Sequence, residues 1–156
     1  MTRDVLGYIF NFVTRIEVER DAAGSVREFM PQSRYVNKRG LRLNKHGAGP
    51  FCQFRIPGYL GYQGVYAVMT DGEISYIGEC ENLSERFNAR GYGTIHPRNC
   101  FERGQPTNCK VNNVILGNAK EGRNMELWFY QTPHRKGIEA ELIRRLQPRW
   151  NSQLKW

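Results

Sequence analysis

Two tyrosines stand near the two ends of a predicted hairpin. Tyr66 and Tyr76 lie in the stretch GVYAVMTDGEISYIG, residues 64–78, which carries a Thr-Asp-Gly turn signal midway. A phenol can donate or accept a proton and can hydrogen-bond a phosphate oxygen, which Val or Ile at the same strand positions cannot do. The two phenols are therefore the first candidates for chemistry in the chain.

The turn decides whether both phenols lie on one face of the hairpin. A two-residue loop at 71–72 pairs Tyr66 with Ile77 and turns the phenols to opposite sides of the sheet. A three-residue loop at 70–72 pairs Tyr66 with Tyr76 on the same side, and we favour it because it requires glycine at its third position. A purely structural pair of cross-strand aromatic neighbours is the alternative.

Further motifs follow the hairpin in a specific order. The motif NLSERF places Arg86 ten residues after Tyr76, while E-x-x-L-I from Glu139 and P-x-x-N ending at Asn151 stand near the end. Together with GVY and YIG, these motifs resemble the GIY-YIG nuclease superfamily over residues 64–151. The spacings are closest to those of the catalytic domain of the nucleotide-excision-repair incision subunit. The resemblance implies a DNA endonuclease that uses Mg²⁺ or Mn²⁺ and no small-molecule cofactor.

The resemblance implies a role for each matched residue. Tyr66 would be the general base or water-orienting group, although a phenol with a pKa of about 10 needs a nearby cation for this. Tyr76 would hydrogen-bond the phosphate or assist proton transfer. Arg86 would bind the phosphate through its planar guanidinium, with a surface salt bridge as its alternative. Glu139 would be the sole metal-ligand carboxylate, completed by phosphate oxygens and waters, and Asn151 would position its neighbours.

Three acidic or basic residues need separate treatment. Glu79 stands where many relatives place Lys after the YIG glycine, so it removes a phosphate-binding cation or points to solvent. Arg90 stands where relatives often have His or Tyr, and it is expected to bind phosphate. Glu141 lies about 200° from Glu139 on a helix, and we expect it to be a solvated partner of nearby arginines.

The residue that replaces the usual His or Tyr after the arginine is not fixed by the pattern. Tyr92 and His96 are the replacements within reach for proton transfer, and His96 has the better pKa. The histidine is otherwise an ordinary surface residue. A zinc site of His96, Cys100 and Cys109 matches no standard ligand spacing.

The second half of the chain predicts an α+β fold with a small, mainly antiparallel sheet flanked by helices. Its elements follow in the order strand, strand, helix, helix, strand, helix. The two hairpin strands come first, and the other expected elements are helices at 82–90, 107–120 and 136–146 and a strand at 125–131. Near the N-terminus, strands are expected at 14–20 and 51–56.

The charge distribution indicates a nucleic-acid partner. The chain carries 23 Lys and Arg against 15 Asp and Glu, a net charge of +8, and no acidic residue occurs from Phe29 through Thr70. Such an excess favours polyanions, although a solvated basic face is the alternative. Residues 1–62 are expected to form a basic, β-rich extension packed on a nuclease core of residues 63–156. The expected DNA contacts there are Arg34, Lys38, Arg39, Arg42 and Lys45.

Aromatic residues are interleaved with these basic residues. They are expected to stack on nucleobases or, for most of them, to be ordinary core residues. They are Tyr35, Phe51, Phe54, Tyr59 and Tyr62.

Two further signals concern the compartment. The apolar stretch at residues 5–13 is far shorter than the ~20 residues that cross a bilayer, so no membrane association is expected. The four cysteines show no C-x-x-C pair. We therefore expect free thiols in a cytoplasmic protein.

The expected substrate is DNA, single- or double-stranded. A sequence-specific restriction-like or mobile-element nuclease and a structure- or single-strand-selective one both suit the sequence, as a monomer or a homodimer. The alternatives are a catalytically inactive nucleic-acid-binding module and an RNA-processing nuclease. Retention of Glu139 argues against the module, since binding alone requires the arginines and not the glutamate.

Overall fold

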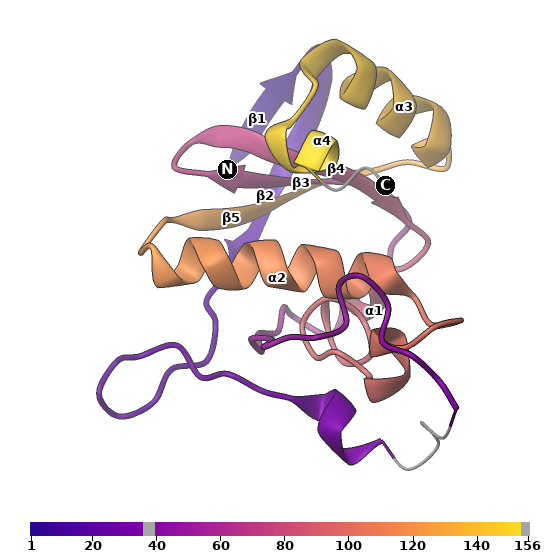
Figure 1. Ribbon diagram of the computed structural model, residues 1–156. Helices are drawn as coiled ribbons and strands as arrows, with labels where there is room; N and C mark the ends of the chain where they lie inside the picture. Colours follow the sequence, from indigo (N-terminus) through magenta and orange to yellow (C-terminus); the bar gives the residue numbers. More distant parts are fainter. Residues whose placement is uncertain (36–39, 154–156) are drawn as a thin grey trace. The chain divides into compact units, whose positions relative to one another are not determined.

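The computed structural model describes residues 1–35 and 40–153 and shows the predicted α+β fold (Figure 1). Five antiparallel strands form one sheet in the order β1-β2-β5-β3-β4. The strands are β1 Thr2–Val5, β2 Tyr8–Arg15, β3 Gly64–Thr70, β4 Glu73–Cys80 and β5 Met125–Gln131. The helices are α1 Leu83–Phe87, α2 Pro106–Lys120, α3 Arg135–Leu146 and α4 Arg149–Gln153, with 3-10 turns η1 Pro31–Arg34 and η2 Pro97–Cys100.

From β3 onward the long elements follow the predicted order, β3, β4, α1, α2, β5 and α3. The helix predicted at 82–90 is shorter, because α1 ends at Phe87 and Arg90 takes a φ of 66°, outside the helical region. The short helix α4 and the η turns were not predicted. All of these lie in segments where side-chain contacts outweigh a weak local pattern.

The N-terminal strand predictions were wrong. The apolar stretch at 5–13 belongs to the β1–β2 hairpin, which turns at Leu6 and Gly7 with φ of 53° and 96°. The strand predicted at 14–20 ends at Arg15, since β5 begins at Met125 and offers no partner beyond it. The strand predicted at 51–56 is reduced to one bridge between Phe51 and Phe29. The basic extension is therefore β-rich only in its first residues.

The chain forms two compact units. Unit 1 comprises Met1–Ile16, Ile56–Ser84 and Arg123–Trp156, and unit 2 comprises Glu17–Arg55 and Glu85–Gly122. Each unit draws on segments from both sides of residue 62. This division therefore does not follow the expected boundary between an extension of 1–62 and a core of 63–156.

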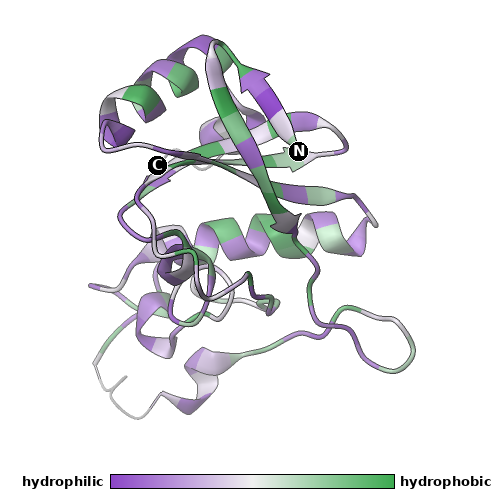
Figure 2. Cartoon of the chain, turned by 180° about the vertical axis from the view of Figure 1, so that it is seen from behind, coloured by the Kyte–Doolittle hydropathy of each residue, from purple (hydrophilic) through white to green (hydrophobic). Residues whose placement is uncertain are grey.

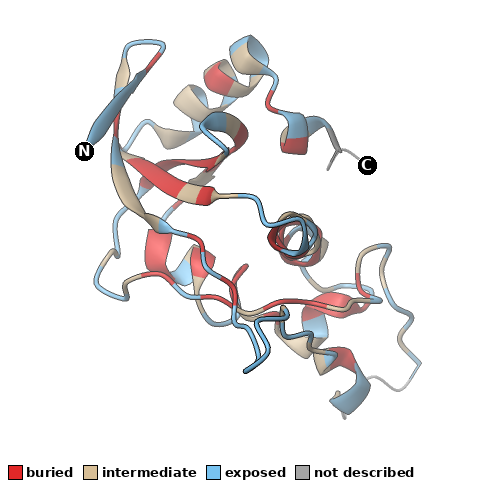
Figure 3. Cartoon of the chain, turned by 90° about the vertical axis from the view of Figure 1, so that its left-hand side faces the viewer, coloured by how far each residue is buried: buried red, intermediate tan, exposed pale blue. Residues whose placement is uncertain are grey.

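Unit 1 has its core between one face of the sheet and α3. Val65, Ala67 and Met69 of β3 alternate toward this face, and Leu142 of α3 is fully buried against them. The apolar residues of α3 recur at the spacing of an amphipathic helix, which Figure 2 shows as green bands separated by purple ones. Figure 3 shows the matching burial, with β3 buried along nearly its whole length.

Unit 2 has helices and loops but, among its described residues, no strand of its own. Its apolar cluster comprises Phe51, Ile95, Cys100, Phe101 and Cys109. Long stretches of its backbone therefore have no strand ladder to satisfy their N–H and C=O groups. Asn112 of α2, with no exposed surface, replaces a ladder by bonding both the N–H and the C=O of Cys52 at 2.9 Å.

None of the helices in the described part of the chain is long and apolar enough to cross a membrane.

Candidate functional site at the edge of β4

The hairpin turn differs from the predicted one. Asp71 and Gly72 form a two-residue turn with φ of 51° and 87°, a pair of positive values typical of a type I′ turn. Past it, a β-bulge between Met69↔Ile74 and Val68↔Tyr76 inserts one extra residue. The predicted three-residue loop, with Tyr66 opposite Tyr76, was therefore wrong.

The bulge nevertheless puts both phenols on one face of the sheet. Tyr66 pairs with Gly78, and Tyr76 stands two residues earlier on β4, which returns it to the same side. The ring centroids are 6.0 Å apart at an interplanar angle of 45°. Tyr66 is 1% exposed and Tyr76 is 9% exposed, so both rings are fixed by packing.

Gly78 explains how the phenol of Tyr66 reaches across β4. A Cβ at this glycine would lie 2.3 Å from both Cζ and the hydroxyl oxygen of Tyr66. Real Cβ atoms do not approach so closely, so only glycine admits the ring at this place. Because β4 is the edge strand of the sheet, the hydroxyl of Tyr66 lies over the edge rather than the centre.

Asn151 joins this edge from α4. Its carboxamide accepts a hydrogen bond from the N–H of Ile77 and donates one to the C=O of Ile77, each at 2.9 Å. The amide thus acts as one more strand residue on the open edge of β4. Trp150, 3% exposed, packs next to Tyr76 with ring centroids 6.5 Å apart. Three consecutive residues of β4 therefore carry or contact the candidate side chains. Tyr76 carries one phenol, Ile77 bonds Asn151, and the phenol of Tyr66 lies over Gly78.

Glu139 lies half-buried on α3. Arg135 stands one turn earlier on the same side of the helix, and its guanidinium pairs with Glu79 of β4. Glu141 lies about 200° away and accepts a hydrogen bond from the phenol of Tyr8 on β2 at 2.9 Å. The side of α3 that carries Glu139 is therefore turned to β4 and not to β2.

The position of Glu139 relative to the tyrosines follows from the sheet. The helix α3 covers the face formed by Val65, Ala67 and Met69, and the phenols lie on the other face. The two faces meet along the edge strand β4. A site that uses Glu139 and the phenols together is thus a site at this edge.

One of the two alternatives for Glu79 was wrong, and so was the expectation for Glu141. Glu79 does not point to solvent, because its side chain is 21% exposed and pairs with Arg135, which also reaches Glu81 at 3.2 Å. Glu141 is not a solvated partner of the arginines, since it accepts the bond from Tyr8. This bond, together with burial, raises the pKa of the Tyr8 phenol.

No group of three or more His, Cys, Asp or Glu side chains gathers in the described residues. His96 therefore does not form a zinc site with Cys100 and Cys109, both of which are free buried thiols. The carboxylate of Glu139 fits the alternative, a cation held by one protein ligand together with phosphate oxygens and waters, which suits Mg²⁺.

Arg86 belongs to unit 2, on a helix whose first residues, Leu83 and Ser84, belong to unit 1. Its guanidinium carbon lies 6.0 Å from the ring centroid of Tyr92, and its C=O accepts the N–H of Tyr92 at 2.9 Å. Tyr92 is 1% exposed. Of the two proposed replacements for proton transfer, Tyr92 is therefore the one that unit 2 places beside the arginine.

The other residues predicted around Arg86 are spread over unit 2. His96 is half-buried, and its Nδ1 accepts the N–H of Arg98 at 3.2 Å at the start of η2, a structural cap. Arg90 is exposed, and its backbone C=O accepts a bond from Asn108 at 3.2 Å.

The predicted DNA contacts in the basic segment are exposed where the structure describes them. Arg34, Arg42 and Lys45 all have exposed side chains. Lys38 and Arg39 lie outside the described residues. Of the interleaved aromatic residues, Phe51 and Phe54 are core, whereas Tyr59 and Tyr62 are 79% and 47% exposed.

These two exposed tyrosines line a pocket of about 260 Å³ in unit 1. Phe129 of β5 forms part of its wall and pairs with Tyr66, so the pocket adjoins the sheet face that carries the phenols. Asn11 and Gln131 add carboxamides that can hydrogen-bond a base. The pocket offers aromatic surface and amides next to the candidate site.

The residues that sequence reasoning missed are Arg135, Trp150 and Tyr8. A signal for Arg135 was present, since it stands four residues before Glu139 and a helix places such residues side by side. Trp150 and Tyr8 gave no signal, because their contacts depend on how α4 and α3 pack.

Comparisons of the chain with family models, curated proteins and solved structures gave no match.

Proposed function

We propose that the protein is a divalent-metal-dependent DNA endonuclease of the GIY-YIG type. The observation that carries the proposal is the grouping of three side chains at residues 76–78 of the edge strand β4. They are the phenols of Tyr66 and Tyr76 and the carboxamide of Asn151. A structural aromatic pair does not require a glycine that lets one phenol cross the edge strand.

Each residue has a defined part in the proposed reaction. The phenol of Tyr66, ionised with the help of a bound cation, would orient the attacking water and accept its proton, and the leaving oxygen would take a proton from solvent. The phenol of Tyr76 would donate a hydrogen bond to the phosphate. Arg86 binds two phosphate oxygens and stabilises the charge that develops on them. Glu139 holds the cation, which when bound supplies charge neutralisation and acidifies its water. Asn151 positions β4 and does not react.

The aromatic pocket of unit 1 has a part in substrate binding. Tyr59 and Tyr62 stack on nucleotides that flank the cut, and Asn11 and Gln131 bond the edges of their bases. Arg42 and Lys45 of the basic segment bind phosphates, and Arg34 of the same segment also contacts the nucleic acid. A cytoplasmic location is part of the proposal, because all four cysteines are free.

The decisive experiment incubates the protein with labelled duplex DNA, single-stranded DNA and RNA, with Mg²⁺ and with a chelator. We expect Mg²⁺-dependent cleavage of DNA. Glu139→Gln removes one carboxylate oxygen with little change in shape and is expected to lower the rate at least about a hundredfold.

The matched control is Glu141→Gln on the same helix. Its amide oxygen can still accept the bond from Tyr8, so cleavage should stay within about twofold of the wild-type rate. Equal rates for the Glu139 and Glu141 variants would contradict the proposed site. DNA binding without cleavage of any substrate by the wild type would instead identify a binding module, and chelator-resistant cleavage of RNA an RNA-processing protein.

A further inference from the structure

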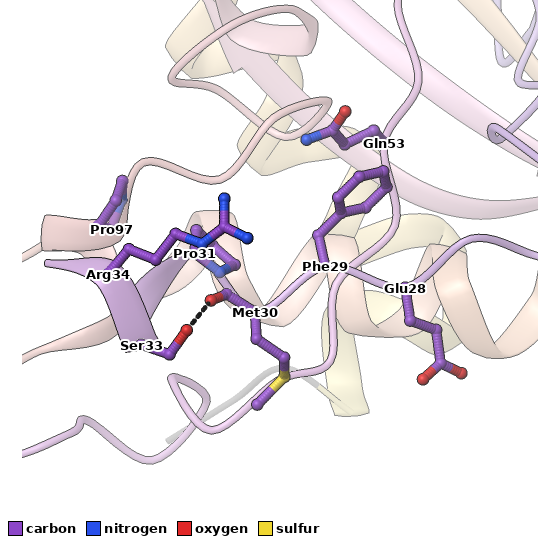
Figure 4. Close-up of a pocket in the computed structure, with 8 residues that line it drawn as sticks. All are labelled: Glu28, Phe29, Met30, Pro31, Ser33, Arg34, Gln53 and Pro97. Carbon is purple, nitrogen blue, oxygen red and sulfur yellow. Dashed lines mark hydrogen bonds between the residues drawn. The ribbon is translucent and has the colours of Figure 1, made fainter.

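Unit 2 contains a second pocket, which is lined by none of the residues assigned to the reaction. It has a volume of about 390 Å³, within the range of small-molecule sites. Figure 4 shows Phe29 and Gln53 on one side of it and Arg34 and Pro97 on the other, with Pro31 between them. Its walls therefore offer one aromatic ring, two proline rings, one amide and one guanidinium.

Two of the four polar side chains that line this pocket have no internal partner. Within residues 1–35 and 40–153, neither the guanidinium of Arg34 nor the carboxamide of Gln53 makes a hydrogen bond or an ion pair. Glu28 lies at the rim, but its carboxylate points away from the pocket and pairs with Lys120 (Figure 4). The pocket is thus positively charged, and its donors remain available to a ligand.

Backbone bonds hold the walls in place without a ligand. Phe29 and Phe51 exchange two backbone hydrogen bonds, of 2.8 and 3.0 Å. The C=O of Gln53 accepts the N–H of Glu19 at 2.8 Å, and Ser33 bonds the C=O of Met30 at 2.8 Å just before Arg34. A preformed pocket binds its ligand with a smaller loss of conformational entropy.

We propose that this pocket binds a single unstacked guanine base of the nucleic-acid substrate. The guanidinium of Arg27 lies over the Phe29 ring, 5.7 Å from its centroid, so the other face of this ring is the stacking surface for a planar base, and the prolines close the opposite side. Arg34 donates two hydrogen bonds to O6 and N7 of guanine, the most common specific contact of arginine with a base. Gln53 can both donate and accept, so it matches guanine, whose edge carries donors and acceptors. Adenine offers a donor at the place of O6, which a guanidinium opposes.

The proposal deepens the nuclease assignment and rests on it for the identity of the polymer. A base in this pocket cannot be paired or stacked in a duplex, so the favoured substrate is single-stranded DNA or a duplex with an extruded base. The basic, acid-free segment that includes Phe29 and Arg34 would bind the adjoining phosphates.

The test measures binding in the presence of a chelator, so that it does not depend on cleavage. Fluorescence anisotropy reports the affinity for a short labelled oligothymidine with one central guanine, and for strands with thymine or an abasic site at that position. We expect the guanine strand to bind about tenfold more tightly than the abasic strand. Competition with free guanosine monophosphate tests whether the base alone, without the rest of the strand, is enough for binding.

Three variants test the walls of the pocket. Phe29→Leu keeps an apolar side chain and removes the stacking ring. Gln53→Ala removes the carboxamide, and Arg34→Lys keeps the charge but loses the planar fork of two donors. Each is expected to lower the preference for guanine over the abasic site to less than about threefold. Arg42→Ala is the matched control, because Arg42 is an exposed arginine of the same segment outside the pocket. It should weaken all three strands equally and leave the preference unchanged.

The outcomes separate this inference from the nuclease assignment. A wild-type protein without preference for guanine, or variants that keep it while circular dichroism shows them folded, would overturn the pocket assignment and leave cleavage unaffected. Should Phe29→Leu fail to fold, the preference in Arg34→Lys, whose side chain is exposed, decides the question alone. A preference for guanine without any cleavage would support the pocket and contradict the nuclease.

Discussion

Each unit contains an asparagine whose carboxamide bonds the backbone N–H and C=O of one distant residue, but the surroundings of that residue differ between the units. In unit 1, Asn151 bonds the N–H and C=O of Ile77, and in unit 2, Asn112 bonds those of Cys52, all at 2.9 Å. Ile77 belongs to a strand that is already paired with β3 on its other side, whereas Cys52 lies in a segment with no strand partner. Asn112 is also fully buried and bonds the C=O of Tyr92 at 2.7 Å.

The difference shows how each unit positions its candidate functional groups. In unit 1 a strand ladder sets the positions of Tyr66 and Tyr76, and the asparagine adds to an existing register. In unit 2 a buried amide takes the place of the ladder, and it joins the loop around Tyr92 to the segment around Cys52. Buried polar groups that lose a partner cost more than exposed ones, which makes the comparison measurable.

The largest effect is expected from Asn112→Ala. It removes three hydrogen bonds and leaves the N–H and C=O of Cys52 and the C=O of Tyr92 unsatisfied. The free energy of unfolding should fall by about 3 to 5 kcal/mol, measured by urea denaturation. Asn118→Ala is the control on the same helix, since its amide bonds only the C=O of Val114, and its effect should lie within about 0.5 kcal/mol. Similar effects for both variants would remove the contrast between the units.

A methyl group at Gly78 tests whether the register of unit 1 fixes the phenol. The new Cβ would meet Cζ and the hydroxyl oxygen of Tyr66, so the ring must move, at a cost of about 1 to 3 kcal/mol. Gly137→Ala on α3 has open space for the same methyl group and should stabilise the protein by about 0.5 to 1 kcal/mol. Thermal unfolding measures both variants. A neutral Gly78→Ala would show that the phenol is not held over β4.

Asn151→Ala should cost less than Asn112→Ala. Ile77 lies on the edge strand, and water can replace the half-buried amide, so we expect a loss of about 1 to 2 kcal/mol in urea denaturation. Ser152→Ala, an exposed neighbour on α4, should change stability by less than about 0.5 kcal/mol. If Asn151→Ala lowers the free energy of unfolding as much as Asn112→Ala does, the two amides are equivalent. The strand ladder next to Ile77 would then not compensate for the loss of the amide.

The effect that is smallest at neutral pH concerns the pH dependence of unit 2. Burial raises the pKa of the Cys52 thiol from an ordinary value near 9 to about 12. The unfolded thiol therefore ionises first, and the stability that the protonated thiol contributes is present below pH 9 and is lost as the pH rises toward 12. Cys52→Ala should show a shallower fall of the unfolding free energy with pH in this range. Parallel curves for wild type and variant would contradict the raised pKa.

The long strands and helices of the second half of the chain, in both units, could be predicted because their local signals agree with one another. The strand at 125–131 and the helices at 107–120 and 136–146 were placed within a residue or two of their observed ends. The side on which the phenols lie was also predicted, but for the wrong reason. A bulge at Ser75 depends on how the hairpin packs, and no residue in the turn signals it.

The sequence by itself determined the α+β order of the elements, the positive charge and the spacing of the candidate site residues, because these depend on periodicity and residue type. Only the tertiary structure decided that Gly78 lets Tyr66 cross the edge strand, that Arg135 neutralises Glu79 and that Asn112 replaces a strand. Each of these contacts joins residues far apart in the chain or depends on a bulge. Their existence therefore follows from packing, which no local pattern records.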